Sequence, residues 1–318
     1  MRVSYQKRIL FTAISMLIAF TLIAAALWFP LVPRDVDITD SIFVLDITDS
    51  MNVKDVEIDG EQVTRLEWAK QFTKETILAM PCGSHAGLAI FSESRSLILI
   101  NPVDVCTTYH DLTQMLEQIN PHMAWARSSE VSKATYTAIK QAKKIQPVPS
   151  IVLMTDGHES PPLNPKLFPK FAGTPGQVHG VLVGIGGDEL LPIPKTNPEG
   201  DLDGFWGVNE VMQKDVYASM RGDLQEYYEN KPRTEHLSSQ KKSHLATLAA
   251  RVGFAFLSSP DDPNELVDVI KSESEPIVQT VDYDLYAWFS GIALVLILLV
   301  FLPYSLFSRK RNPSSVHD

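Results

Sequence analysis

The sequence predicts one doubly wound α/β domain with a mostly parallel central sheet, one antiparallel edge strand, and a transmembrane helix on either side of the domain. Three observations indicate this fold class. Segments of strand length alternate with segments of helical periodicity from residue 35 to residue 283. Residues 151–154 form a continuous apolar run, which is typical of a strand buried on both faces of a parallel sheet. Charge-free runs of transmembrane length lie before and after this domain.

The first half of the domain predicts a strand, a helix and a hairpin. Residues 42–45 form a short apolar strand, and residues 62–80 place apolar side chains at helical spacing. Two apolar segments, 86–91 and 96–100, are separated by the polar residues 92–95. This pattern is typical of an antiparallel hairpin, so we expect the second of these strands at an edge of the sheet.

The second half continues the alternation of strands and helices. Between residues 192 and 233, proline, glycine and asparagine interrupt the pattern, and we interpret this stretch as an insertion within which residues 209–228 could form a helix. The other predicted elements are helices over 108–119 and 131–145, strands over 151–154 and 178–185, a helix over 243–251, a strand over 253–257 and a helix over 264–271.

Two apolar runs predict membrane anchors. Residues 9–29 and 285–307 contain no charged residue, and each run is long enough to cross about 30 Å of hydrocarbon. By the positive-inside rule the two ends, 1–8 and 308–318, face the cytoplasm. The basic residues that indicate this are Arg2, Lys7, Arg8, Arg309, Lys310 and Arg311. The domain at 35–283 is then expected in the periplasm of a bacterium, held at the inner membrane.

A cleaved signal peptide is the alternative for the first run, because Ala24 to Ala26 supply small residues of the kind that precede a cleavage site. The apolar stretch is longer than the roughly 7 to 15 residues of a signal-peptide core. We therefore favour an uncleaved signal anchor.

The two cysteines are expected to pair, and the net charge argues against one class of function. In an oxidising compartment Cys82 and Cys106 are expected to form a disulfide that closes a loop of about 25 residues and stabilises the fold by about 3 kcal/mol, with two free thiols as the alternative. The formal net charge of −10 argues against a nucleic-acid-binding protein, which would present a basic surface.

Oxygen-bearing side chains gather after the first predicted strand. Asp46, Thr48 and Ser50 alternate along the chain, so a turn after Leu45 lets all three point into one cavity at the carboxyl end of the strand. Carboxylate and hydroxyl oxygens are ligands for a hard divalent cation, Mg²⁺ or Ca²⁺, and the ligands do not choose between the two. The alternative is that these residues only cap the next helix.

Two further segments are expected at the same edge of the sheet. Ser128 and Ser129 precede the helix that starts at Val131, and Asp156 follows the strand at 151–154. The whole set resembles the metal-ion-dependent adhesion site of the von Willebrand factor A family, which combines Asp-x-Ser-x-Ser, a later Thr and an Asp in a Thr-Asp-Gly turn. In that comparison Asp46, Ser50 and Asp156 match directly, Thr48 stands at the first Ser position, and Ser129 stands at the Thr position. Asp49 and Ser128 are the alternatives at neighbouring positions.

The resemblance implies a binding function rather than an enzyme. In this family a Glu or Asp of the partner completes the coordination of the metal, so binding is reversible and metal-dependent. The sequence offers no convincing pair of nucleophile and general base. His158 is expected to be a solvated loop residue, and residues 125–127 are expected to border the metal edge.

A narrower resemblance connects the chain with membrane-anchored bacterial proteins encoded beside MoxR-type AAA ATPases. It involves Gly184-Ile185-Gly186, residues 191–194 and the second apolar run, and the group includes the Bat aerotolerance proteins and the MxaC- and MxaL-like proteins of methanol-oxidation gene clusters. It implies an assembly or Ca²⁺-insertion factor for a periplasmic enzyme, plausibly methanol dehydrogenase. The alternative is a structural subunit of a MoxR/Bat-type envelope stress or aerotolerance complex. Implied partners are a periplasmic protein with an acidic side chain, other membrane proteins of this family and a MoxR-type ATPase.

Overall fold

A computed structural model describes residues 2–28, 31–163, 168–197, 201–214, 232–274 and 277–301. The chain forms two compact units. One unit is Asp37–Gln279, and the other combines Met1–Val36 with Thr280–Asp318.

A six-stranded sheet lies at the centre of the larger unit, with strand order β13-β8-β7-β2-β5-β6. Its strands are β2 (Asp40–Asp46), β5 (His85–Ser92), β6 (Arg95–Asp104), β7 (Ser150–Thr155), β8 (Gly180–Gly184) and β13 (Ala255–Ser258). Every pairing in it is parallel except the one between β5 and β6. The predicted mostly parallel sheet with an antiparallel edge strand is therefore confirmed.

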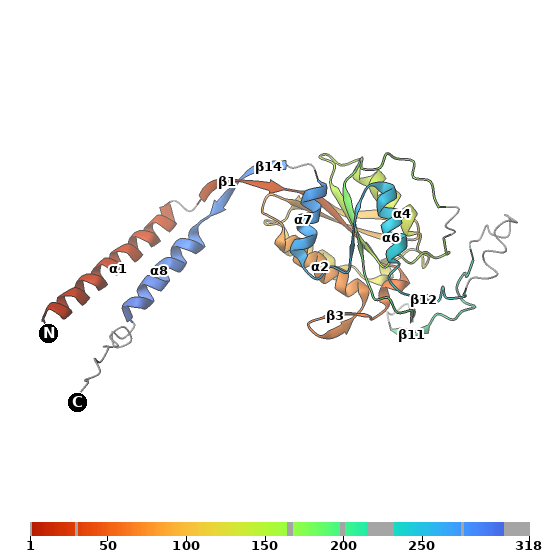
Figure 1. Ribbon diagram of the computed structural model, residues 1–318, viewed down its shortest axis with the longest axis horizontal. Helices are drawn as coiled ribbons and strands as arrows, with labels where there is room; N and C mark the ends of the chain where they lie inside the picture. The colour runs from red at the N-terminus through yellow and green to blue at the C-terminus, as the bar shows by residue number, and fades with distance from the viewer. Residues whose placement is uncertain are drawn as a thin grey trace, which may run out of the picture. The chain divides into compact units, whose positions relative to one another are not determined.

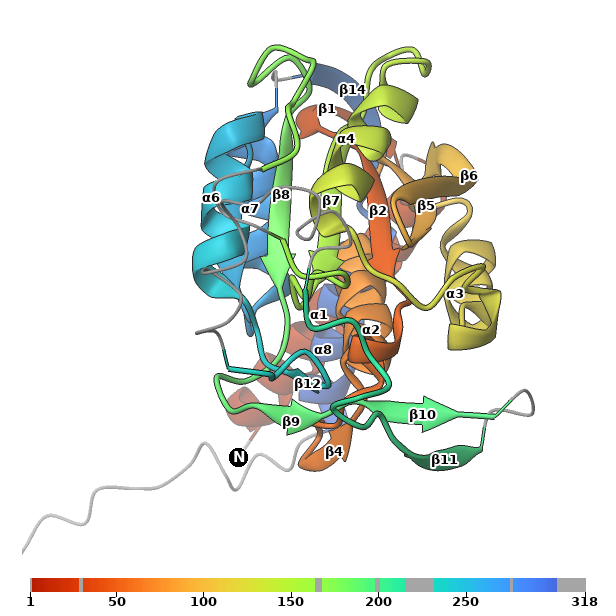
Figure 2. The same ribbon diagram turned by 90° about the vertical axis from the view of Figure 1, so that its right-hand side faces the viewer.

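Helices cover both faces of this sheet (Figures 1 and 2). On one face are α2 (Arg65–Ala79), α3 (Tyr109–Gln118) and α7 (Pro263–Glu273), which pack with Phe43 and Leu45 of β2. On the other face are α4 (Val131–Ala142) and α6 (Lys242–Val252), which pack with Ile42 and Val44. Because successive side chains of a strand point to opposite faces, β2 needs apolar residues at every position, and this explains its continuous apolar run.

Local chemistry sets where α2 begins. Thr64 and Glu67 form a capping box, in which the Thr64 hydroxyl accepts from the Glu67 amide at 3.1 Å and the Glu67 carboxylate accepts from the Thr64 amide at 2.9 Å. The helix therefore starts at Arg65 and not at residue 62, as the apolar spacing had predicted. The preceding residues form a hairpin of β3 (Val56–Ile58) and β4 (Glu61–Val63).

The insertion predicted at 192–233 leaves and re-enters the domain at one place. Its ends pair as antiparallel strands, β9 (Leu191–Pro192) with β12 (Leu237–Ser238), and a hairpin of β10 (Pro194–Thr196) and β11 (Leu202–Phe205) lies between them. Residues 209–214 form turns and bends, whereas the rest of the predicted helix at 209–228 lies outside the described residues.

The smaller unit contains the apolar helices. Within α1 (Arg2–Trp28), the segment Ile9–Trp28 is long and apolar enough to cross a membrane. The second predicted anchor is described only as α8 (Tyr286–Phe301), whose 16 residues extend about 24 Å, and residues 302–307 lie outside the described chain. The helices α1 and α8 lie side by side in Figure 1, and β1 (Leu31–Ile38) pairs with β14 (Ile277–Asp284). One clear membrane-crossing helix is thus present among the described residues, and the second span stays a prediction.

A disulfide joins Cys82, in the loop after α2, to Cys106, in the turn after β6. Their Cα atoms are 5.3 Å apart. The bridge ties α2 to the edge strand of the sheet.

Candidate functional site

Three loops meet at the carboxyl ends of β2 and β7. Asp46 is the last residue of β2, and Asp156 follows β7, its neighbour in the sheet. A short 3-10 helix, η1 (Asp49–Asn52), carries Ser50, whose hydroxyl donates to Asp156 Oδ1 at 3.1 Å. Thr48, Ser50 and Ser129 line one pocket of about 170 Å³. The five residues singled out from the sequence therefore lie at one edge of the sheet.

Asp46 is completely buried, and both of its carboxylate oxygens accept hydrogen bonds. Oδ1 accepts from the Thr48 amide at 2.9 Å and from the Thr48 hydroxyl at 2.6 Å, while Oδ2 accepts from the Thr155 hydroxyl at 2.6 Å. Burial, followed by repulsion from Asp156, raises the pKa of Asp46 to about 7. The negative charge of Asp46 is thus poorly compensated by the surrounding protein.

Asp156 is equally buried, but unlike Asp46 it has a positively charged partner. Its Oδ2 accepts from the Ser238 hydroxyl at 2.5 Å and from Arg65 Nη1 at 2.7 Å, and its Oδ1 accepts from the His158 amide at 2.9 Å. Burial alone would raise the pKa of Asp156, yet the attraction of the Arg65 guanidinium and the hydrogen bonds from Ser238 and the His158 amide, among the lowering causes, together outweigh it, and the pKa lies below its ordinary value. Asp156 is therefore held ionised.

Ser129 carries a buried hydroxyl without a described hydrogen-bond partner. Its backbone is fixed, because its amide donates to Ser160 O at 2.9 Å and its carbonyl accepts from the Ser160 amide at 2.6 Å. The side chain is buried, and its Oγ has no hydrogen-bond partner among the described residues. A buried polar atom without a partner is unusual and destabilising, so this atom is suited to a ligand. Ser128 is half-buried and lines the same pocket.

This donor set fits a hard divalent cation. Thr48, Ser50 and Ser129 line the pocket, and the carboxylates of Asp46 and Asp156 lie buried behind Thr48 and Ser50. The Ser129 hydroxyl is unpaired, and the carboxylate of Asp46 lacks a compensating charge. In the described part of the chain, no group of three or more His, Cys, Asp or Glu side chains is arranged to hold a metal ion. A cation held by Asp46 and Asp156 would therefore rely on hydroxyl oxygens for its remaining protein ligands.

His158 is not solvated, and that expectation was wrong. Its side chain lines the pocket, is almost completely buried, and has no described hydrogen-bond partner at either ring nitrogen. Burial lowers its pKa, so the ring is neutral. The backbone turns at Gly157, whose φ of +78° lies in the left-handed region, and this turn directs the following residue inwards.

The rim of the pocket contains a tryptophan that the sequence reasoning missed. Trp206 follows β11 in the insertion, and its Nε1 donates to Asp49 Oδ2 at 3.1 Å. Arg127 and Lys195 lie over its ring at 5.4 and 4.8 Å from the centroid. Asp49 is also 3.7 Å from Arg127 Nη1, so it belongs to the rim. Arg127 borders the pocket as expected, whereas Trp125 does not line it.

Arg65 was also missed, although two features of the sequence hint at it. An arginine in the first turn of a helix faces the positive end of the helix dipole, so it indicates an acidic partner. The partners are Asp55 and Asp156, and the Arg65 side chain is completely buried between them. The second hint is Gly186, where a Cβ would lie 2.5 Å from Arg65 Nε, so that the glycine leaves room for the guanidinium.

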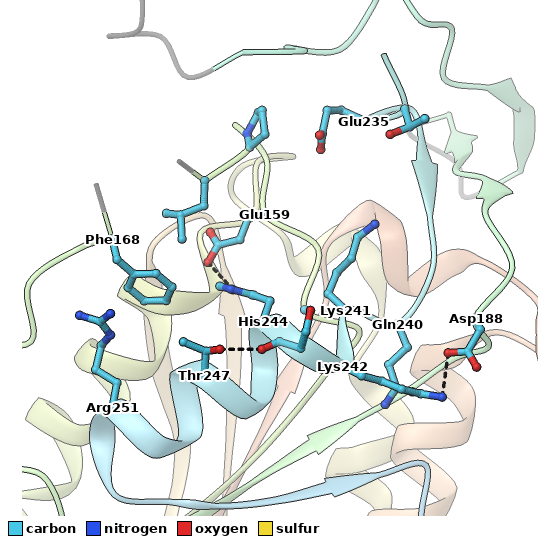
Figure 3. Close-up of a pocket in the computed structure, with 15 residues that line it drawn as sticks. Glu159, Phe168, Asp188, Glu235, Gln240, Lys241, Lys242, His244, Thr247 and Arg251 are labelled. Carbon is cyan, nitrogen blue, oxygen red and sulfur yellow. Dashed lines mark hydrogen bonds and ion pairs between the residues drawn. The ribbon is translucent and has the colours of Figure 1, made fainter. Parts of the chain in front are cut away.

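A larger pocket of about 750 Å³ lies beside the site, between the loop after β7 and the start of α6 (Figure 3). Its charged groups are largely paired with one another. Lys242 contacts Asp188 at 2.7 Å, and His244 Nε2 is 3.0 Å from Glu159 Oε1. Arg251 lies 4.2 Å from the centre of the Phe168 ring. These contacts leave few unpaired charges among the lining residues named here.

Residues 41–158 match the model of the von Willebrand factor type A domain. No curated protein sequence matches the chain. Among solved structures, an aerotolerance-related membrane protein from Bacteroides fragilis is 16% identical, with 74% of this chain and 99% of that chain covered and a TM-score of 0.49. BatB from Bacteroides thetaiotaomicron is also 16% identical, covering 74% and 96%, with a TM-score of 0.46. The ArnB paralog VWA2 from Sulfolobus acidocaldarius is 11% identical, covering 77% and 48%, with a TM-score of 0.40.

Proposed function

We propose that this protein is a membrane-tethered, metal-dependent protein-interaction module. Asp46, Thr48, Ser50, Ser129 and Asp156 would hold Mg²⁺ or Ca²⁺, and a Glu or Asp of a partner would complete the coordination. The observation that carries this proposal is the buried, unpaired hydroxyl of Ser129, a residue that lines the same pocket as Thr48 and Ser50, the hydrogen-bond partners of the two buried carboxylates. The cation would supply a positive charge for Asp46 and an exchangeable position for the partner carboxylate.

The chain's own residues prepare that position. The hydroxyls of Thr48 and Thr155 fix the Asp46 carboxylate, and Ser50 fixes Oδ1 of Asp156. The strands β2 and β7 are buried on both faces, so the carboxylates at their ends are attached to a rigid backbone. A partner that docks here therefore meets a preorganised set of ligands and loses little free energy in ordering them.

We propose binding rather than catalysis. In the described part of the chain, the arrangement closest to a catalytic triad is Ser132, Glu159 and His244. Glu159 is its middle member, because it accepts from the Ser132 hydroxyl at 2.7 Å and lies 3.0 Å from His244 Nε2. In a Ser-His-acid triad the histidine lies next to the serine, and here the carboxylate takes that place. Glu159 also accepts from the Ser132 amide and so caps α4.

The proposed setting is an envelope complex of the MoxR/Bat type. The aerotolerance-related and Bat proteins reported above favour it, whereas none of those similarities concerns methanol dehydrogenase. Maturation of methanol dehydrogenase by an MxaL-like protein is therefore the second candidate, and it rests on the local sequence resemblance alone. The proposed partners are other membrane proteins with this domain, a MoxR-type ATPase and an acidic periplasmic protein. The charge asymmetry around α1 and residues 285–307 supports a periplasmic domain.

Co-purification from native membranes tests the proposal. The full-length protein is extracted in detergent with Ca²⁺ or Mg²⁺ present, and again after chelation, as the parent and as Asp46→Asn. Asn keeps the shape of Asp46 but removes its charge, so we expect the metal-dependent partner to be lost at least tenfold.

The matched control is Asp40→Asn, at the opposite end of the same strand, where Asp40 Oδ1 is 2.7 Å from His85 Nδ1. It is expected to recover the partner as the parent does. A partner that Asp46→Asn still recovers at the parent level, in a metal-dependent way, contradicts the proposed coordination. Recovery of a dehydrogenase instead of membrane subunits would favour the second candidate.

A further inference from the structure

Arg65 is a completely buried arginine that contacts the proposed metal site from behind. It forms a two-pronged ion pair with Asp55, with Nε at 2.8 Å from Oδ1 and Nη2 at 2.6 Å from Oδ2. Its remaining nitrogen, Nη1, donates to Asp156 Oδ2 at 2.7 Å and to Ser238 Oγ at 2.6 Å. One guanidinium is thus shared between two carboxylates.

The fold provides a dedicated space for this guanidinium. Gly186 has a φ of +103°, and a Cβ at that position would lie 2.5 Å from Arg65 Nε. The amide of Gly187 donates to Asp55 Oδ2 at 2.9 Å, which holds the other end of the ion pair. The glycine-rich turn after β8 therefore accommodates Arg65.

The contacts divide the two oxygens of Asp156 between different tasks. Oδ2 accepts from Arg65 and Ser238, whereas Oδ1 accepts from the His158 amide and from the hydroxyl of Ser50, a residue that lines the pocket. Asp156 can therefore offer a cation one oxygen, the one beside Ser50, and its charge is partly neutralised by the Arg65 that it shares with Asp55. Since the affinity of a divalent-cation site depends on the number of charged ligands, the attraction toward a cation comes mainly from Asp46.

We infer that Arg65 is a positioning residue that holds Asp156 as a partly neutralised, one-oxygen ligand and so keeps the affinity for a divalent cation low until a partner carboxylate adds negative charge. This inference rests on the proposed function and names its regulation. Metal and partner then each strengthen the binding of the other by the same factor, because coupling between binding sites is reciprocal. Detachment of the partner would release the cation as well.

Metal titration of the full-length protein in detergent tests the inference, with Mg²⁺ and Ca²⁺ alone as probes and calorimetry as the readout. The variants are Arg65→Met, which removes the charge, and Arg65→Lys, which keeps it. We expect Arg65→Met to bind at least one of the cations at least about tenfold more tightly than the parent, because a full positive charge has left the site. Arg65→Lys keeps the charge but loses the two-pronged contact, so its affinity is expected to lie between those of the parent and Arg65→Met.

Two further variants distinguish a change in metal affinity from a change in folding stability. Arg65→Met leaves two buried carboxylates unpaired and should unfold at a lower temperature without metal. The double variant R65M/D55N removes the Asp55 pair as a whole, so it is expected to fold better while still binding metal more tightly than the parent. Lys70→Met is the control, because Lys70 lies on the same helix and donates to the carbonyls of Glu117 and Ile119, away from the site.

Acetate serves as a probe for the partner carboxylate. At equal ionic strength and equal free metal, acetate in place of chloride is expected to raise the metal affinity of the parent more than that of R65M/D55N. A parent that binds metal while R65M/D55N binds no more tightly, or an equal effect of acetate on both, overturns the role of Arg65 and leaves the proposed function intact. Absence of metal binding in the parent and in every variant overturns both.

Discussion

Ser129 is the residue whose surroundings best distinguish a metal-binding site from an ordinary loop. Without metal, Ser129→Ala removes a buried hydroxyl that has no described partner, so we expect the melting temperature to stay equal or rise slightly. With metal, the same variant loses a ligand and should bind Ca²⁺ or Mg²⁺ at least about tenfold more weakly. Substitutions around other metal sites lower metal affinity by a similar factor. Thermal unfolding and calorimetric titration measure the two effects.

Ser128→Ala is the matched control at the neighbouring position. Ser128 lines the same pocket, so this pair of variants also decides between the two serines. If Ser128→Ala loses the metal and Ser129→Ala keeps it, the ligand assignment of Ser129 is wrong.

At the residue scale, the sequence predicts which side chains gather at the edge but not how their charges are balanced. Asp46, Thr48, Ser50 and Asp156 follow buried strands, so their meeting is a consequence of the sheet order. The burial of His158 and Arg65 depends on turns at Gly157 and Gly186 that tuck these side chains inwards. Such tertiary contacts leave no periodic signal in the sequence.

At the element scale, Trp206 connects the insertion to the metal edge. Its indole donates to Asp49, and its backbone amide donates to Ile193 O at 3.0 Å. Trp206→Phe keeps an aromatic ring but removes the indole donor. We expect faster amide hydrogen exchange in 191–206 and an otherwise unchanged exchange pattern, measured by mass spectrometry. Trp125→Phe, at an exposed position, is the control. Equal exchange in the parent and in Trp206→Phe would show that the indole contact does not hold the insertion.

The disulfide is the second element-scale feature. It closes the chain segment between the end of α2 and the turn after β6, with a sequence separation of 24 residues. Its removal in Cys82→Ala/Cys106→Ala should lower the free energy of unfolding by about 3 kcal/mol, because the unfolded chain gains freedom. Urea unfolding of the full-length protein, oxidised and with reductant, measures this. A reductant effect that persists in the double variant would assign the loss to another cause.

Periodicity predicts the elements better than their ends. The alternation of strands and helices and the hairpin at 86–100 correspond to β2, α2, β5, β6 and the elements that follow. The start of α2 is set by the Thr64 and Glu67 capping box, which the apolar spacing does not register. The insertion has no regular period, so its pairing of β9 with β12 could not be predicted.

At the scale of the whole molecule, the membrane topology is predicted from α1 and from the basic residues at the two ends of the chain. Leu78 on α2 is 67% exposed, and the two native cysteines are bridged, so Leu78→Cys provides one free thiol on the domain. In intact spheroplasts we expect a membrane-impermeant maleimide to label this thiol. Labelling that requires permeabilisation would place the domain in the cytoplasm and contradict the predicted orientation.

The central claim is that the loops after β2 and β7, together with Ser129, hold a divalent cation. Crystals soaked in Mn²⁺, which shares the oxygen ligands of Mg²⁺ and Ca²⁺, test it most directly through anomalous scattering. We predict one Mn²⁺ peak in the pocket, within about 2.6 Å of the hydroxyl oxygens of Ser50 and Ser129. A pocket without anomalous density at saturating Mn²⁺, or a peak that none of the five residues contacts, would contradict the account.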